Sequence, residues 1–406
     1  MVRTLFRLGL AAPLVAGSLA VGLAGSPASA TTFTVTDPAD DVTAPNTLRW
    51  AIAQAAADPE ASVIEIAPGL TIDLTCAGGG ALGYDSAADL PLTVNGNGAS
   101  ITQTCVGSAV LTSAGEDLEI HGTTIAGGSA GGIVAGGDIL LEGSTVEATT
   151  AGGGITAYNG TATIIGSTLQ DNVGSAGGGV GAIHVVIERS TLSGNRSTTG
   201  GGAWADQTLT VRNSTITANT ATASGGGLYA GLNRIDLTYV TLVENVAPAG
   251  ANLDLDSSST LTAFASLIGD PLGGGDDCQL PPAATIASTG ANISSDGSCG
   301  LTAGPGDLDG TDPGVGPLAA NGGPTRTRLP EPSSPALDRA DCSASDLTTD
   351  QRVVLRPQGA ACDAGAVEVE QPADGGGLTT STNGPAGPAP SAPAATPVAA
   401  SPRFTG

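Results

Sequence analysis

The residues best suited to hold a ligand are three aromatic side chains and one acid in the middle of the chain. Trp204 and Tyr229 are 25 residues apart, and each lies two positions after a run of three glycines. Asp206 lies two positions after Trp204, and Tyr158 takes the corresponding position after an earlier glycine run. Aromatic rings beside a carboxylate are suited to holding sugar rings. These four residues therefore predict a sugar-contacting surface; the alternative is that the rings only cover a strand or pack under a loop.

An acidic loop is the one candidate for binding a metal ion. Asp307, Asp309 and Asp312 supply spaced carboxylates of the kind found in calcium loops, but no bidentate Glu follows at the required distance. A structural calcium ion is therefore the only cofactor for which the sequence offers candidate ligands, and no other metal or cofactor is predicted. No C-x-x-C occurs, and His121 and His184 are far from every cysteine.

No complete catalytic set is found. Elimination needs a cationic base facing a calcium-binding group of carboxylates, but the chain has no lysine and no three acids share one exposed position of the repeats. The acid pairs Asp40-Asp41 and Asp276-Asp277 lie outside the repeats, so they do not supply the paired acids of hydrolysis. His121 with Glu142 and Glu188 with Arg212 are predicted to form surface pairs between neighbouring coils. Together these observations favour a non-catalytic protein.

The elements that position these residues come from a repeat of about two dozen residues. A Thr-aliphatic pair, in most repeats preceded by Ser or Thr, recurs with gaps of 21, 23, 23, 24 and 26 residues. A fixed period of this size indicates a stacked repeat architecture. The aliphatic members of the pairs are Ile125, Val146, Leu169, Leu192, Ile216 and Leu242.

Each repeat carries three sets of aliphatic residues that should face inward. One set comes before the Thr-aliphatic pair, one belongs to it, and one follows the glycine runs, as at Val180 and Ala182. Side chains alternate between the two faces of a strand, so three sets indicate three short strands per coil. The sequence thus predicts an all-β, single-stranded, right-handed parallel β-helix. Turn asparagines should form a ladder of amide hydrogen bonds at Asn172, Asn195, Asn219 and Asn245.

The chain divides into five predicted regions. Arg3 and Arg7 precede an apolar run that ends in small residues, which is typical of a cleaved signal peptide, with an uncleaved anchor as the alternative. No later stretch is long and apolar enough to span a membrane. A capping helix is expected from Leu48 to Ala57. The regions are a signal peptide (1–30), an N-terminal cap of strand, helix and strand (31–66), β-helix repeats (67–269), an irregular C-terminal cap (270–370) and a disordered stalk rich in Pro, Ala, Ser and Thr (371–406).

Charge and cysteine content limit partners and compartment. The net charge of −25 and the absence of lysine argue against nucleic acid as a partner. Six cysteines in an exported chain predict three disulfides. Neighbours in sequence are the predicted partners: Cys76 with Cys105, Cys278 with Cys299, and Cys342 with Cys362.

Two segments resemble known families of secreted bacterial proteins. Phe33-Thr-Val-Thr with Thr47-Leu-Arg-Trp-Ala-Ile52 resembles the N-terminal motif of CSLREAI-domain proteins. Several later motifs, among them Asn321-Gly-Gly-Pro-Thr325, Asp350-Gln-Arg352 and Ala361-Cys-Asp-Ala-Gly365, resemble the choice-of-anchor Q domain, although Val353, Ala364 and Val367 replace that family's usual glycine, isoleucine and phenylalanine. The resemblance implies an exported β-helix of the pectin-lyase-like kind, often held at the cell surface, and implies no particular activity.

These patterns together predict a secreted or cell-surface, monomeric β-helix that presents a repetitive surface for adhesion or glycan contact. Its partner would be a glycan or another cell-surface ligand. The first alternative is a carbohydrate-active enzyme, either a polysaccharide lyase or a glycoside hydrolase of the pectin-lyase-like fold. The second alternative is a purely structural envelope protein.

Overall fold

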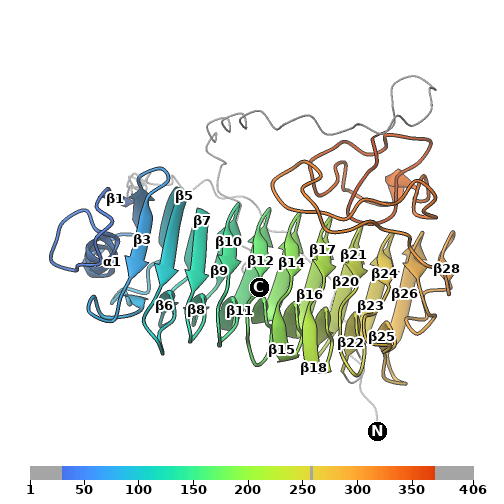
Figure 1. Ribbon diagram of the computed structural model, residues 1–406, viewed down its shortest axis with the longest axis horizontal. Helices are drawn as coiled ribbons and strands as arrows, with labels where there is room; N and C mark the ends of the chain where they lie inside the picture. The colour runs from blue at the N-terminus through green and yellow to red at the C-terminus, as the bar shows by residue number, and fades with distance from the viewer. Residues whose placement is uncertain (1–29, 257–258, 371–406) are drawn as a thin grey trace, which may run out of the picture. The chain divides into compact units, whose positions relative to one another are not determined.

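The computed structural model describes residues 30–256 and 259–370. The predicted stalk and all but the last residue of the predicted signal peptide lie outside this part of the chain. The described residues form a parallel β-helix, in which strands of successive coils pair in parallel along three ladders (Figure 1). The fold class predicted from the period is therefore confirmed. None of the helices in the described part of the chain has the length and apolar character needed to cross a bilayer.

Five long strands each turn a corner and take part in two ladders. They are β5 (Leu92–Gln103), β7 (Leu118–Gly127), β11 (Ile155–Ile165), β13 (Val180–Glu188) and β16 (Ala203–Arg212). The first ladder also contains β1 (Thr31–Val35), β2 (Ser62–Ile66), β9 (Ile139–Glu142), β20 (Arg234–Thr238), β23 (Thr260–Phe264) and β26 (Thr285–Gly290).

The other two ladders are built from shorter strands. The second ladder contains β3 (Thr71–Leu74), β10 (Thr145–Glu147), β12 (Thr168–Gln170), β14 (Thr191–Ser193), β17 (Thr215–Thr217), β21 (Thr241–Val243), β24 (Leu267–Gly269), β27 (Ile293–Ser294) and β28 (Leu308–Asp309). The third ladder contains β4 (Leu82–Tyr84), β6 (Leu111–Ser113), β8 (Ile133–Ala135), β19 (Leu228–Ala230), β22 (Leu253–Leu255) and β25 (Cys278–Gln279). A small extra pair joins β15 (Arg196–Thr199) to β18 (Thr220–Ser224).

Register places the three aliphatic sets in three buried columns. Ile187 pairs with Val211 in the first ladder, Leu192 with Ile216 in the second, and Val180 with Ala203 in the third, all in parallel. These side chains are fully buried. Burying an aliphatic side chain of this size contributes about 1.5–3 kcal/mol, so the repeated columns are the main source of stability.

Buried asparagines form the predicted amide ladder at one corner of the coils. Each side-chain amide donates to the side-chain oxygen of the next coil, over 3.0 Å from Asn172 to Asn195 and 2.9 Å from Asn195 to Asn219. The ladder continues through Asn245 and Asn252. It ends at Asp277, whose carboxylate accepts from Asn252 over 2.8 Å.

Helix α1 (Leu48–Ala57) covers the N-terminal end of the coils (Figure 1). Thr47 caps the helix, because its hydroxyl accepts from the Trp50 amide over 3.3 Å. Leu48 and Ile52 are buried and face the interior lined by Leu82 and Val94. The helix thus shields apolar side chains that the first coil would otherwise expose, as the sequence predicts.

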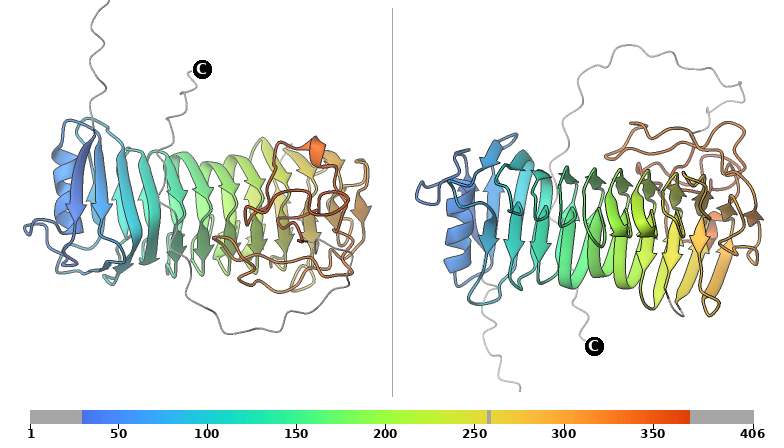
Figure 2. Two further views of the ribbon diagram at one scale, coloured as in Figure 1. Left: turned by 90° about the horizontal axis from the view of Figure 1, so that it is seen from above. Right: turned by 60° about the horizontal axis from the view of Figure 1, so that its bottom comes forward.

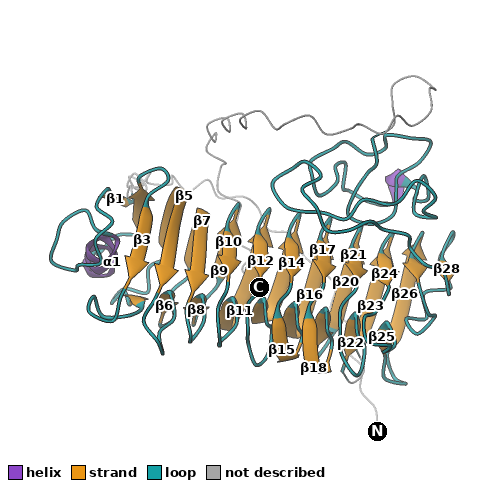
Figure 3. Cartoon of the chain, viewed as in Figure 1, coloured by secondary structure: helices purple, strands orange, loops and turns teal. Residues whose placement is uncertain are grey.

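All three predicted disulfides are formed, with Cα atoms 4.8, 4.9 and 5.4 Å apart for the pairs that begin at Cys76, Cys278 and Cys342. The last disulfide lies in a segment without strands (residues 313–370), which we call the C-terminal segment. It contains one short 3-10 helix, η1 (Cys342–Ala344), and is otherwise loop (Figure 3).

The C-terminal segment folds back along the second ladder (Figures 1 and 2), a placement that the sequence did not indicate. The outward-facing threonines of that ladder hold it in place. The Thr215 hydroxyl donates to the Gln351 side chain over 2.7 Å, and the Thr241 hydroxyl accepts from the Ala366 amide over 3.0 Å. Threonines that would otherwise face water are thus covered by a side chain and by backbone of the C-terminal segment.

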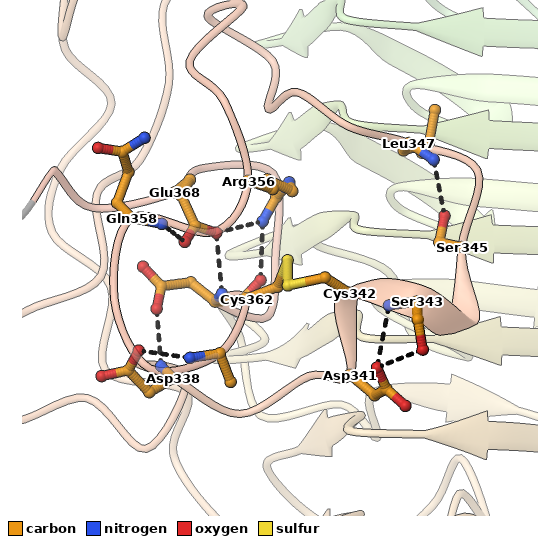
Figure 4. Close-up of a disulfide and its surroundings, with 12 residues drawn as sticks. Asp338, Asp341, Cys342, Ser343, Ser345, Leu347, Arg356, Gln358, Cys362 and Glu368 are labelled. Carbon is orange, nitrogen blue, oxygen red and sulfur yellow. Dashed lines mark hydrogen bonds and ion pairs between the residues drawn. A yellow bond between two sulfur atoms is a disulfide. The ribbon is translucent and has the colours of Figure 1, made fainter.

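A buried ion pair organises the C-terminal segment close to its disulfide (Figure 4). Arg356 donates to Glu368 over 2.9 Å, and both side chains are fully buried. The Arg356 guanidinium also lies over the Tyr239 ring, 4.0 Å from its centroid. Burial raises the pKa of the Glu368 carboxyl, against the opposing effect of backbone amides of Gln358 and Asp363 that donate to it.

Candidate ligand-binding site

A hollow of about 430 Å³ lies on the outer surface of the third ladder. Register pairs Thr156 with Gly181 and Gly181 with Trp204, so these three residues occupy one outward column on consecutive coils. Of the four residues predicted to contact sugar, Tyr158, Trp204 and Asp206 line this hollow. Its lining comprises Gly152, Thr156, Ala157, Tyr158, Ser175, Ala176, Gly181, Ala182, Ile183, Trp204 and Asp206.

The hollow exists because one position of the outward column is a glycine. Gly181 stands between Thr156 and Trp204 and has no side chain to fill the space between them. A Cβ atom added there would lie 2.8 Å from the Ala176 carbonyl oxygen, which is too close for an unshifted backbone. Tyr158 is 66% exposed at one side of the hollow, so its ring is available to a ligand. The geometry suits a flat, partly apolar ring with polar edges.

Tyr229 lies one coil beyond Trp204, as the period predicts, but it does not line the hollow. Its hydroxyl donates to the Asp256 carboxylate over 3.3 Å. Burial, together with the charges of Asp256 and Asp254, raises the pKa of Tyr229 to about 12. Tyr229 therefore extends the aromatic surface from the hollow towards a group of acids.

The residue that follows Tyr229 in this outward column is an acid, Asp254, which is not among the site residues predicted from the sequence. Asp254 pairs with Tyr229 in register and is only 8% exposed. Burial raises the pKa of its carboxyl, and the Asp256 charge adds to the effect. Asp254 follows Tyr229 by 25 residues, the same interval that separates Tyr229 from Trp204. Extending the column by one more period would have found it.

The two other sets of candidate residues do not form a site. Asp307 accepts from the Asn292 and Gly304 amides, and Asp312 from the Gly314 amide, so these carboxylates fix their own loops. Asp309 does not join them in a metal-binding group, and in the described ranges no three acids, histidines or cysteines are placed to hold a metal ion.

Two ion pairs were predicted between neighbouring coils. The structure confirms the pair of His121 with Glu142, but the predicted pair of Glu188 with Arg212 is wrong. His121 lies 3.2 Å from Glu142, as predicted. Glu188 and Arg212 occupy neighbouring coils as predicted, but Glu188 pairs with Arg189 over 2.6 Å and Arg212 with Asp346 over 2.8 Å. The C-terminal segment brings Asp346 to Arg212, and a repeat pattern does not encode that approach.

A second groove, of about 460 Å³, runs between the first ladder and the C-terminal segment. Arg212 and Arg234 both line it, but each guanidinium already has a carboxylate partner, Asp346 and Asp236 respectively. The groove also lacks exposed aromatic rings. It is therefore a weaker candidate than the hollow at Trp204.

No family model and no curated protein matches the chain, so membership of the CSLREAI or choice-of-anchor Q families stays a prediction. Among solved structures, the crystal structure of pectate lyase Pel9A is similar at 14% sequence identity and a TM-score of 0.43, covering 84% of this chain and 97% of that chain. The parallel β-helix itself is established by the ladders of this chain.

Proposed function

We propose that the chain is an exported, non-catalytic β-helix protein of the cell envelope that contacts glycans through the hollow at Tyr158, Trp204 and Asp206. The observation that carries this proposal is the convergence of two aromatic rings and a carboxylate around a space left open by Gly181. Binding sites for sugars need such a combination of apolar ring faces and polar edges.

The proposed location rests on other features. Three disulfides among the described residues are compatible with an oxidising, extracellular environment. The N-terminal sequence pattern and the resemblance to choice-of-anchor Q proteins point in the same direction. Attachment to the cell surface is part of the proposal, and fractionation of the producing cells would test it.

Replacing Trp204 tests the site. Trp204→Ala is expected to weaken binding on a glycan array by about 10-fold or more, equivalent to about 1.4 kcal/mol, because an aromatic contact is removed. Trp204 faces outward, so its loss should leave the thermal unfolding midpoint nearly unchanged. Leu355→Ala is the matched control, since Leu355 is an exposed apolar residue of the C-terminal segment and is 65% exposed.

A reducing-end assay on the glycans that bind separates the proposal from its rivals. Binding without new reducing ends supports the proposal. Turnover abolished by Asp206→Asn would instead support a carbohydrate-active enzyme. Absence of both binding and turnover would leave a structural envelope protein.

A further inference from the structure

Asp206, which lines the hollow, and Asp256 lie on either side of a second glycine, Gly231. The Gly231 amide donates to the Ala205 carbonyl over 2.9 Å, and the Asp256 amide donates to the Ala230 carbonyl over 3.0 Å. Asp206, Gly231 and Asp256 therefore occupy equivalent positions on three consecutive coils. Coils are spaced by about 4.8 Å, and Gly231 itself places no side chain between the two acids.

The local charge at this end of the hollow is negative. Asp206 is half-buried, Asp256 is exposed, and the nearly buried Asp254 lies beside them in the adjoining outward column. Within the described part of the chain, no ion pair with an arginine or histidine involves Asp206 or Asp254. All three carboxylates act on the Tyr229 hydroxyl, whose pKa they raise together with burial.

A ligand in the hollow therefore meets the Tyr158 ring at one end and, two coils away, the Trp204 ring beside the Asp206 carboxylate. A uronate sugar would bring its own carboxylate towards Asp206 and Asp256, and like charges repel in a site partly removed from water. A protonated amine on the sugar would be attracted by the same groups. A cation close to Tyr229 or Trp204 would also interact favourably with the ring faces.

We infer that the ligand is a glycan containing amino sugars with free, protonated amino groups. Its ring would lie against Trp204 and Tyr158, and its ammonium group would lie towards Asp206 and Asp256. This inference rests on the proposed function and adds the ligand class to it. Asp206 and Asp256 are the residues that would set specificity.

The test compares three oligosaccharides of equal length by titration calorimetry with the full chain: a glucosamine hexamer, an N-acetylglucosamine hexamer and a galacturonate hexamer. At a pH where the amines are protonated, the glucosamine hexamer should bind about 10-fold more tightly than its acetylated form. The galacturonate hexamer should not bind measurably. The preference for the amine should shrink when salt is raised.

Two acid-to-amide variants separate specific from general attraction, because the whole chain carries a net charge of −25. Asp206→Asn should lower the preference for the amine about 5-fold and leave binding of the acetylated hexamer unchanged. Asp73→Asn makes the same charge change at an exposed position of the second ladder and should have almost no effect. Equal losses in the two variants would mean non-specific attraction and would overturn the inference.

The outcomes also distinguish this inference from the proposed function. If the acetylated hexamer binds through Trp204 as tightly as the amine, the glycan-binding surface stands and the amino-sugar preference is wrong. If none of the three hexamers binds, the preference is wrong, and the glycan array decides whether the surface binds other sugars.

Discussion

Single residues in this chain acquire their roles from their position in a coil. Trp204 faces outward because it lies between the buried Ala203 and Ala205, and Gly181 opens the hollow because it lies one coil away.

Val353 has a backbone conformation that does not suit its side chain. Its φ angle is +71°, in the left-handed region, where a β-branched side chain is unfavourable.

Val353→Gly should therefore stabilise the protein. Removing the strain gains about 1–2 kcal/mol, and the greater freedom of glycine in the unfolded chain offsets part of that gain. We expect a net increase of about 0.5–1 kcal/mol in the free energy of unfolding, measured by urea denaturation. Val354→Gly is the control, because Val354 lies outside the left-handed region and its replacement should be destabilising. Equal destabilisation by both changes would show that Val353 is not strained.

At the scale of the elements, the asparagine ladder links successive coils through side-chain hydrogen bonds, and the strands link them through backbone hydrogen bonds. Asn219 is fully buried, accepts from Asn195 and donates to Asn245 and to the Leu192 carbonyl. Because Asn219 both donates and accepts along the ladder, removing its side chain leaves buried partners on two neighbouring coils without a hydrogen bond.

Asn219→Ala should lower the free energy of unfolding by about 3–5 kcal/mol, since buried unsatisfied groups cost about 1–3 kcal/mol each. Thermal and urea unfolding would measure the loss. Asn159→Ala removes an exposed asparagine outside the ladder and should change stability by less than about 0.5 kcal/mol. If the two variants were equally stable, the ladder would contribute nothing to the stacking of coils.

At the scale of the whole described unit, the C-terminal segment is attached to the coils through buried polar contacts. Gln351 donates to the Thr191 hydroxyl over 2.9 Å and accepts from Thr215. Arg356 pairs with Glu368 and covers Tyr239, which belongs to the coil between β20 and β21. Loss of one partner of a buried ion pair leaves an uncompensated charge.

Arg356→Met should cost about 3–5 kcal/mol and loosen the C-terminal segment from the second ladder. Limited proteolysis followed by mass spectrometry should then find new cleavage sites within residues 313–370, while the coils keep their far-ultraviolet β-signal. The double variant Arg356→Met with Glu368→Gln removes both charges but keeps a side-chain oxygen for the backbone amides that donate to Glu368, and it should recover part of the stability. Protection of the segment in the single variant would show that the ion pair does not hold it.

The sequence predicted much of the candidate site, for a reason that applies to Trp204, Asp206 and Tyr158 alike. Trp204 and Asp206 share one coil and Tyr158 lies two coils earlier at an equivalent place in the repeat, so alternation along the strands puts all three on one outer surface. The acid at Asp254 was accessible to the same reasoning and was overlooked. Asp346, by contrast, reaches Arg212 from 134 residues away in a segment without a period. No spacing rule connects the two residues.

The amino-acid sequence by itself determined the stacking of coils, the buried columns, the asparagine ladder, the capping helix and the disulfide partners. These features are local or periodic, and strand alternation converts a period directly into an inside and an outside. Only the tertiary structure decided which ladder the C-terminal segment covers and that Arg212 pairs with Asp346 in place of Glu188. Those contacts depend on matching two surfaces far apart in sequence, and on satisfying the polar groups that this contact buries.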